Sequence, residues 1–297
     1  MNAQMSGQLA ALGTAFCWSI TSLSFEAAGK RVGSLQVNLI RLVFAFLFFL
    51  VYSIIVRHQL LPTDADGNLW VWLLLSGLAG FVLGDLFLFR AFVEVGARIS
   101  MLVYSSVPLI TAILGRVFLG ERLTVLQSGA MAVTVAGIII VTTSRKTALE
   151  RVQRIGRGVW FAFIGAVGQA LGLVLGAYGA PDYDVFSATQ IRTIAGIIGF
   201  LVVISVSKRW PSVRDAIKNR PAMRHTLRGS FFGPFLGVSL GLFAAQHAGT
   251  GIAATIIATV PIILIPVSFF LFREKISIRE IAGSVIAVSG VAVLFFR

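Results

Sequence analysis

Ionisable side chains inside long apolar stretches are the residues of this sequence that could do chemistry. A charge at the centre of a membrane helix costs about 2.5–3.5 kcal/mol even on lenient scales, so such a residue usually has a function or a partner. Asp85 lies just past the middle of one apolar stretch, and Arg90 follows five residues later. Arg41 and Arg192 lie about two turns into two other stretches, and Glu26 lies near the end of the first.

Two interpretations of Asp85 follow from these positions. In one, the carboxylate faces a central cavity, where it binds a cationic group of a solute or carries a proton. In the other, it forms an ion pair with Arg41 or Arg90 that fixes the packing, because buried charges are usually paired. The sequence leaves both open.

Polar and aromatic side chains near the middle of four apolar stretches could complete a binding site. They are Trp18, Ser19, Tyr104, Ser106, Gln169, Thr255 and Thr259. Solute pockets are mostly apolar with a few placed polar groups, and this set has that character. We expect these side chains and Asp85 to line a solute pathway, although any one of them is more often an interhelical hydrogen bond or filler.

Glycines and prolines shape the segments that carry these groups. The glycines spaced by four are Gly168, Gly172 and Gly176, and Gly229, Gly233, Gly237 and Gly241. Such spacing lets neighbouring helix backbones approach closely, either as a sliding surface between moving halves or as static packing. Pro108 and Pro261 lie in mid-segment, where a proline removes a backbone hydrogen bond, so each predicts a hinge or a fixed kink.

The elements that must position these residues are membrane helices. The chain has 297 residues, of which 57% are hydrophobic and 12% charged, whereas soluble domains carry about 25% charged residues. A helix needs about 20 apolar residues to cross a bilayer, and ten such runs are present. Their approximate bounds are Leu9–Ala28, Leu35–Val56, Trp70–Phe92, Ala97–Phe118, Thr124–Thr143, Gly158–Tyr178, Val185–Val206, Gly229–Gln246, Gly251–Phe272 and Ile278–Phe296. Pro211 and Pro221 mark the loop after the seventh.

The distribution of the net charge of +13 predicts how the helices are oriented. Most lysines and arginines lie in the odd-numbered connections, whereas the opposite side holds Arg57, Arg116, Arg122 and Arg297. The positive-inside rule therefore predicts an inner-membrane protein with both termini outside. We expect the basic connections to contact anionic lipid, and we expect no nucleic-acid binding because no folded basic domain is present.

The two halves of the sequence match each other. A shift of 153 positions aligns Gly80 with Gly233, Gly84 with Gly237, Pro108 with Pro261 and Glu121 with Glu274, and a shift of 151 aligns Arg41 with Arg192 and Trp18 with Gln169. Five spans are an odd number, so the second copy enters the membrane from the opposite face. The expected fold is an all-α polytopic membrane protein with ten transmembrane helices in two inverted five-helix repeats. The repeats comprise residues 1–146 and 158–297, joined by a basic linker at 147–157.

The repeated motif resembles the end of an EamA domain. Its first copy runs from Pro108 through Gly120-Glu121-Arg122 to Gly137, and its second from Pro261 through Arg273-Glu274-Lys275 to Gly290. The resemblance covers nearly the whole chain and implies a ten-helix member of the drug/metabolite transporter superfamily, whose members export amino acids, nucleosides, drugs and other metabolites. Many relatives are expected to have cytoplasmic termini; for this sequence we follow the charge distribution, which predicts the reverse.

The expected function is a secondary transporter that exports small organic metabolites, amino acids or similar amphipathic solutes, by alternating access. Without a P-loop the flux must run down a gradient, with protons as one candidate coupling ion. A passive channel is the alternative function. The alternative explanation of the repeat is a gene duplication that merely enlarged the helix bundle and has no role in transport. A membrane-embedded enzyme is less expected, because one cysteine and three scattered histidines form no catalytic constellation. We expect no cofactor and no metal, and a monomer suffices because one chain holds both halves.

Overall fold

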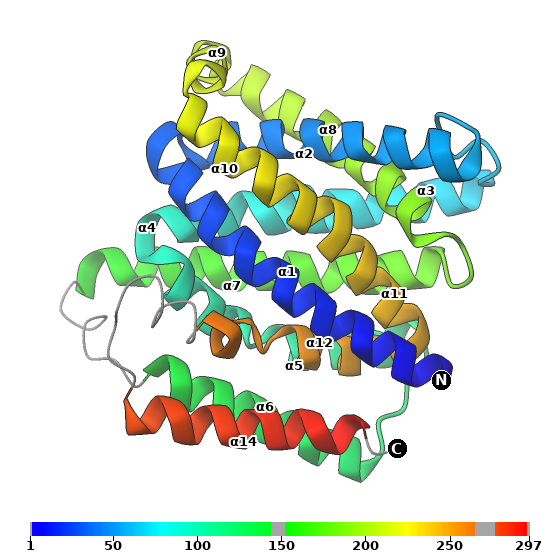
Figure 1. The fold of residues 1–297 in the computed structure, drawn as a ribbon, viewed down its shortest axis with the longest axis vertical. Coiled ribbons are helices and arrows are strands. Elements are labelled where there is room, and N and C mark those ends of the chain that lie inside the picture. Colours follow the sequence, from blue (N-terminus) through cyan, green and yellow to red (C-terminus); the bar gives the residue numbers. More distant parts are fainter. Residues whose placement is uncertain (1, 144–151, 265–276, 296–297) are drawn as a thin grey trace.

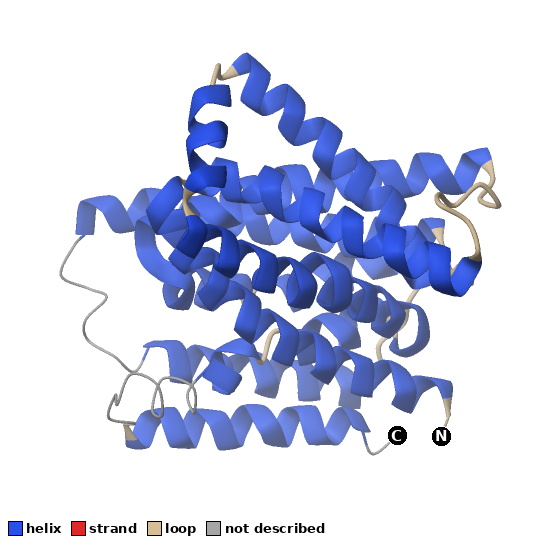
Figure 2. Cartoon of the chain, turned by 45° about the horizontal axis from the view of Figure 1, so that its top comes forward, coloured by secondary structure: helices blue, strands red, loops and turns tan. Residues whose placement is uncertain are grey.

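The computed structural model describes residues 2–143, 152–264 and 277–295, and every regular element in these ranges is a helix (Figures 1 and 2). The second motif around Glu274, residues 147–151 of the expected linker and the end of the ninth expected span lie outside the described residues. The all-α fold class predicted from the sequence is confirmed.

The first half consists of six α-helices and two π-helical segments. They are α1 (Ala3–Val32), α2 (Ser34–Tyr52), η1 (Ser53–Arg57), α3 (Gly67–Gly77), η2 (Leu78–Gly84), α4 (Asp85–Tyr104), α5 (Val107–Phe118) and α6 (Val125–Thr143). The elements described in the second half are α7 (Val152–Gly179), α8 (Val185–Val206), α9 (Trp210–Lys218), α10 (Arg220–Ser230), η4 (Phe231–Gly237), α11 (Val238–Ala248), α12 (Thr250–Ile257) and α14 (Ile278–Phe295).

These elements form the ten spans in two inverted repeats that the sequence predicts. Five continuous helical stretches are long and apolar enough to cross a membrane, at 34–57, 67–96, 156–179, 185–206 and 220–248. The eighth span begins earlier than predicted, because Asn219 caps α10 and Pro221 occupies its first turn, where no N–H is needed. The predicted loop before it contains helix α9, whose first turn accommodates Pro211 in the same way.

Irregular backbone features recur at matching positions of the two repeats. The π-helical segments η2 and η4 lie 153 residues apart, the same shift that aligns the sequences. Gly96 and Gly249 both have a left-handed φ, of 83° and 87°, where the next span begins. Each following span is then interrupted by a turn, at 105–106 and at 258–259. The repeat is therefore a repeat of backbone geometry as well as of residue types.

The halves pack against each other through glycines at two equivalent interfaces. A side chain at Gly172 of α7 would begin 2.7 Å from the Cα of Gly80 in η2, so only glycine allows this backbone approach. At the second interface, η4 packs on α1, and a side chain at Gly233 would begin 2.8 Å from Thr21. Each interface joins the first span of one repeat to the third span of the other.

The ends of the helices lie at two opposite ends of the bundle, which correspond to the two faces of the membrane. The start of α1 and the end of α14 lie at one end of the bundle, and the α1–α2 connection and α9 lie at the other (Figure 1). Helices α6 and α14 form a closely packed pair at one side, where a side chain at Gly137 would begin 2.4 Å from the backbone of Ala287. The first and last helices thus begin and end on the same face, as the predicted topology requires. Which of the two faces is cytoplasmic stays a prediction.

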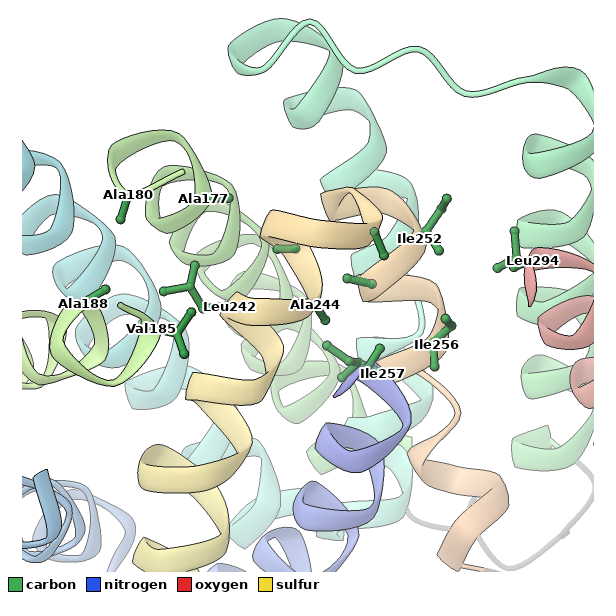
Figure 3. Packing of buried hydrophobic residues seen from close by; sticks show 14 of the residues in the cluster. Ala177, Ala180, Val185, Ala188, Leu242, Ala244, Ile252, Ile256, Ile257 and Leu294 are labelled. Atoms are coloured by element: carbon green, nitrogen blue, oxygen red, sulfur yellow. The ribbon is translucent and has the colours of Figure 1, made fainter. Parts of the chain in front are cut away.

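Apolar side chains fill the interior, and large apolar side chains also cover the outside. Figure 3 shows alanines, isoleucines and leucines of α7, α8, α11, α12 and α14 in the largest buried cluster. Outside, Val117, Val125 and Val206 are 72%, 92% and 79% exposed. Large exposed apolar surfaces are unfavourable in water, so this surface fits a lipid environment.

Candidate functional site

Two adjoining cavities lie in the middle of the bundle, between matching helices of the two repeats. They share four lining residues, Trp18, Phe81, Gln169 and Val238. Their free volumes are about 40 and 30 Å³, enough for about two or three water molecules each. An organic solute therefore requires the cavities to widen.

Asp85 is the centre of a buried polar cluster in the first cavity. Arg41 Nη2 donates to Asp85 Oδ2, and both side chains are almost fully buried. Gln169 Nε2 donates to the second carboxylate oxygen. Asn38 holds the arginine, because its Oδ1 accepts a 3.0 Å hydrogen bond from Arg41 Nε. The contacts come from α2, α4 and α7, so the cluster joins the two repeats.

These contacts bear on both interpretations of Asp85. The ion pair with Arg41 that the second interpretation required is present, whereas Arg90 is half-exposed and pairs with Glu94 at 2.6 Å. The carboxylate also lines the cavity, as the first interpretation required. A role in solute or proton binding therefore stays a hypothesis.

Arg192 of α8 lies at the position that matches Arg41 and lines the second cavity. It is 4% exposed, and within the described part of the chain it makes one hydrogen bond, from Nη2 to the backbone oxygen of Gly172 at 3.4 Å. Its Nε and Nη1 have no hydrogen-bond partner among the described residues. Phe81 lies beside both arginines, with its ring centroid 5.7 Å from Cζ of Arg41 and 5.4 Å from Cζ of Arg192.

The structure brings only part of the predicted polar set to the cavities. Trp18, Tyr104 and Gln169 line them, and Trp18 meets the Tyr104 ring edge-on at 5.5 Å between centroids. The hydroxyls of the other four members donate to backbone oxygens three or four residues earlier in the chain; these are Ser19, Ser106, Thr255 and Thr259. Their participation in solute binding stays a prediction.

The remaining predicted residues lie around the cavities or towards the helix ends. Glu26 pairs with Lys30, one turn further along α1. Pro108 and Pro261 follow the turns at 105–106 and 258–259, so each lies where a span restarts rather than inside one continuous kinked helix. Interrupted helices of this kind border the binding sites of many transporters, and a hinge role for these turns stays a prediction.

Glu121, from the first copy of the motif, caps a helix of the other repeat. Its carboxylate accepts hydrogen bonds from the backbone N–H of Thr250 at 2.7 Å and from the hydroxyl of Thr250 at 2.9 Å. A negative charge at the start of α12 satisfies free N–H groups and complements the helix dipole. The motif thus has a structural role in joining the halves.

We expect Glu121→Ala to destabilise the protein by about 1–2 kcal/mol, the usual cost of losing a helix cap with its charge. Thermal unfolding of the purified protein in detergent measures this effect. Arg122→Ala is the matched control, because that neighbouring side chain is exposed, and it should unfold with the wild type. Equal stability of both variants would contradict the capping role.

A second network joins the repeats at the end that carries the termini. Asp64 accepts hydrogen bonds from Arg57 at 2.6 Å, Gln59 at 2.8 Å and Tyr183 at 3.0 Å. Slight burial opposes ionisation of this carboxyl group, but the three hydrogen bonds prevail and lower its pKa to about 2. Sequence reasoning missed this network because its members come from two loops far apart in the chain.

The lowered pKa of Asp64 predicts a small acid sensitivity. Ionised Asp64 stabilises the fold above its ordinary pKa of 3.8, and this contribution disappears as the pH falls through about 2. Because the side chain is 41% exposed, we expect less than about 1 kcal/mol. Between about pH 4 and pH 2, the melting temperature should fall less for Asp64→Asn than for the wild type, and the exposed Asp182→Asn control should follow the wild type.

Ten membrane helices in two inverted repeats around a small buried polar site define a polytopic membrane protein with the architecture of a carrier. Residues 5–143 and 156–296 both match the EamA-like transporter family. The chain belongs to this family, and it is a multi-pass membrane transporter of small solutes.

Two other comparisons find one distant relative in sequence and one protein of the same fold. The chain is 20% identical, over 287 residues, to a WAT1-related chloroplastic protein of Arabidopsis thaliana, and the match covers 95% of this chain and 67% of that protein. A protein of known crystal structure has the same fold, with a TM-score of 0.71 at 15% identity. That match covers 98% of this chain and 96% of the other.

Proposed function

We propose that the chain is a secondary transporter that exports small organic metabolites, such as amino acids or similar amphipathic solutes, by alternating access. The observation that carries this proposal is the pair of cavities that adjoin at Trp18 and its repeat-equivalent Gln169. A site built from equivalent positions of inverted repeats can be exposed to either face when the repeats exchange conformations.

The two glycine interfaces are the surfaces at which the repeats slide in that exchange. At both the α7–η2 and the α1–η4 contact, helices meet with little or no side chain on one face, so sliding there disturbs few interlocked groups. The π-helical segments lie at these same contacts, and such segments occur frequently at functional sites. Movement at either interface would widen the cavities for a solute.

Further features belong to the same proposal. Asp85 is the candidate proton carrier, because it is the carboxylate at the cavity wall. The repeats are taken as residues 1–146 and 158–297, with the chain acting as a monomer in the inner membrane and both termini outside. A passive channel is the alternative to this carrier. In a channel, the pathway can be open to both faces of the membrane at once, so the two halves need not close around the solute.

Flux measurements in liposomes test this function. The purified protein is screened with amino acids, nucleosides and cationic drugs at two pH values. Saturable flux with counterflow is expected of a carrier, whereas unsaturated conduction would favour a channel. Trp18→Ala should reduce flux by at least about tenfold, because Trp18 walls both cavities. Trp160→Ala is the matched control, since that side chain is 65% exposed on the outside; equal loss in both variants would count against the cavity as the pathway.

A further inference from the structure

The two equivalent arginines at the cavities have different surroundings. In the first repeat, the carboxylate of Asp85 and the side-chain oxygen of Asn38 accept hydrogen bonds from Arg41. Val238 stands at the repeat position of Asp85, and Thr189 stands at that of Asn38. The Thr189 hydroxyl donates to the backbone oxygen of Val185 at 2.7 Å, and among the described residues Arg192 Nε and Nη1 have no acceptor. Arg192 therefore lacks both acceptors that its counterpart has.

An unpaired buried guanidinium is costly, so its presence requires a reason. Buried polar groups nearly always have hydrogen-bond partners, and buried charges are paired or neutralised. Arg192 is 4% exposed and has two nitrogen atoms without a partner in the described part of the chain. These atoms belong to a side chain that lines a cavity, where a ligand can supply the missing acceptor.

The charge and shape of the site indicate what that ligand is. The described residues of the cavity walls include two arginines and one carboxylate, which leaves one unbalanced positive charge. Around Arg192 the wall is mostly apolar or aromatic, with Trp18, Tyr104 and Leu173, and Gln169 adds one polar side chain. A ligand with one negative charge on an apolar body complements both features.

We infer that Arg192 binds the carboxylate of an amphipathic organic solute, which takes the place that Asp85 occupies beside Arg41. This inference rests on the proposed transport function and narrows its substrates to carboxylates. The planar guanidinium can offer its free Nε–H and Nη1–H to the two carboxylate oxygens. Because the excess charge is one, a monocarboxylate should bind more tightly than a zwitterion of the same size.

Ligand-dependent thermal unfolding of the full chain in detergent tests this site without requiring transport. The probes share a phenyl body and differ in charge: 3-phenylpropionate, phenylalanine, 3-phenylpropanol, 3-phenylpropylamine and phenyl phosphate. At about a hundredfold excess over Kd, 3-phenylpropionate should raise Tm by about 5 °C, with a smaller rise for phenylalanine. The alcohol and the amine should give no rise. A larger rise with the amine or with phenyl phosphate would overturn the assignment to a carboxylate.

Two variants and one control test the role of the arginine. Arg192→Gln should weaken binding of 3-phenylpropionate by at least about tenfold while leaving the ligand-free Tm unchanged or higher, because an unpaired charge is removed. Arg90→Gln removes a half-exposed arginine and should bind as the wild type does. Retained binding in Arg192→Gln would overturn the inference.

Val238→Asp keeps the test decisive even if Arg192→Gln fails to fold. An aspartate there restores the missing partner from within the chain, so the ligand-free Tm should rise and the response to 3-phenylpropionate should disappear. A variant that still responds would contradict the inference. If no carboxylate binds but a cation shows saturable flux, the inference about Arg192 fails and the proposed transport function stands. If carboxylates bind but no flux is measured, the proposed transport function fails.

Discussion

Asp85→Leu is expected to destabilise the protein by about 3–5 kcal/mol and to abolish transport. The substitution leaves the buried Arg41 guanidinium without its carboxylate, and breaking one partner of a buried ion pair has this cost. Among the described residues, Gln169 also loses one of its two acceptors in the opposite repeat and keeps only the backbone oxygen of Gly80. Thermal unfolding in detergent and liposome flux measure the two effects. Asp215→Leu is the control, because that carboxylate is exposed on α9 and should leave both quantities unchanged.

A second pair of variants separates the structural role of Asp85 from its role in transport. Arg41→Met combined with Asp85→Leu removes both charges and should recover most of the lost stability, because a buried ion pair can often be replaced by apolar residues. Asp85→Asn keeps the shape of the side chain. If Asp85→Asn transports with an unchanged pH profile, Asp85 is a packing residue and carries neither solute nor proton.

Gly172→Leu is expected to have the other large effect, a loss of about 3 kcal/mol or more together with loss of transport. The first atom of any side chain here would lie 2.7 Å from the Cα of Gly80, so α7 and η2 must separate. That separation would displace Gln169, one turn away in α7, from Asp85. Thermal unfolding and flux again measure the outcome.

The glycines of the chain also offer a matched control for this substitution. Gly129→Leu places the same side chain on α6, where no atom lies within 4 Å of the new Cβ, and helix propensity favours leucine over glycine. It should be neutral or slightly stabilising. If Gly172→Leu unfolds at the same temperature as Gly129→Leu, the close contact between the repeats does not support the fold.

The parts of the fold that depend on composition and local pattern were predictable from the sequence. Apolar run lengths indicated the ten spans, and matched glycines and prolines indicated the repeat. Helix α9 was missed because Pro211 was interpreted as a breaker, although a proline in the first turn of a helix loses no hydrogen bond. The π-helical segments have no comparable sequence signal.

The candidate site was predictable in its members but only partly in its contacts. Asp85 and the two equivalent arginines were identified because they are ionisable residues inside apolar membrane-spanning stretches, where such groups are rare. Which arginine pairs with Asp85 depends on contacts between residues far apart in the chain. The one available signal for Arg192 was the repeat itself, since Val238 at the position of Asp85 leaves it without a carboxylate of its own to bind.

Thiol accessibility of one cavity residue tests most directly whether both halves close on a shared site. Val238 lines both cavities, and Cys17 is the one native cysteine, so Val238→Cys in a Cys17→Ser background carries a single reporter thiol. Alternating access predicts labelling by a membrane-impermeant thiol reagent from either face of sealed vesicles, with a transported solute slowing the reaction from both. Labelling from one face alone under every condition would contradict this account.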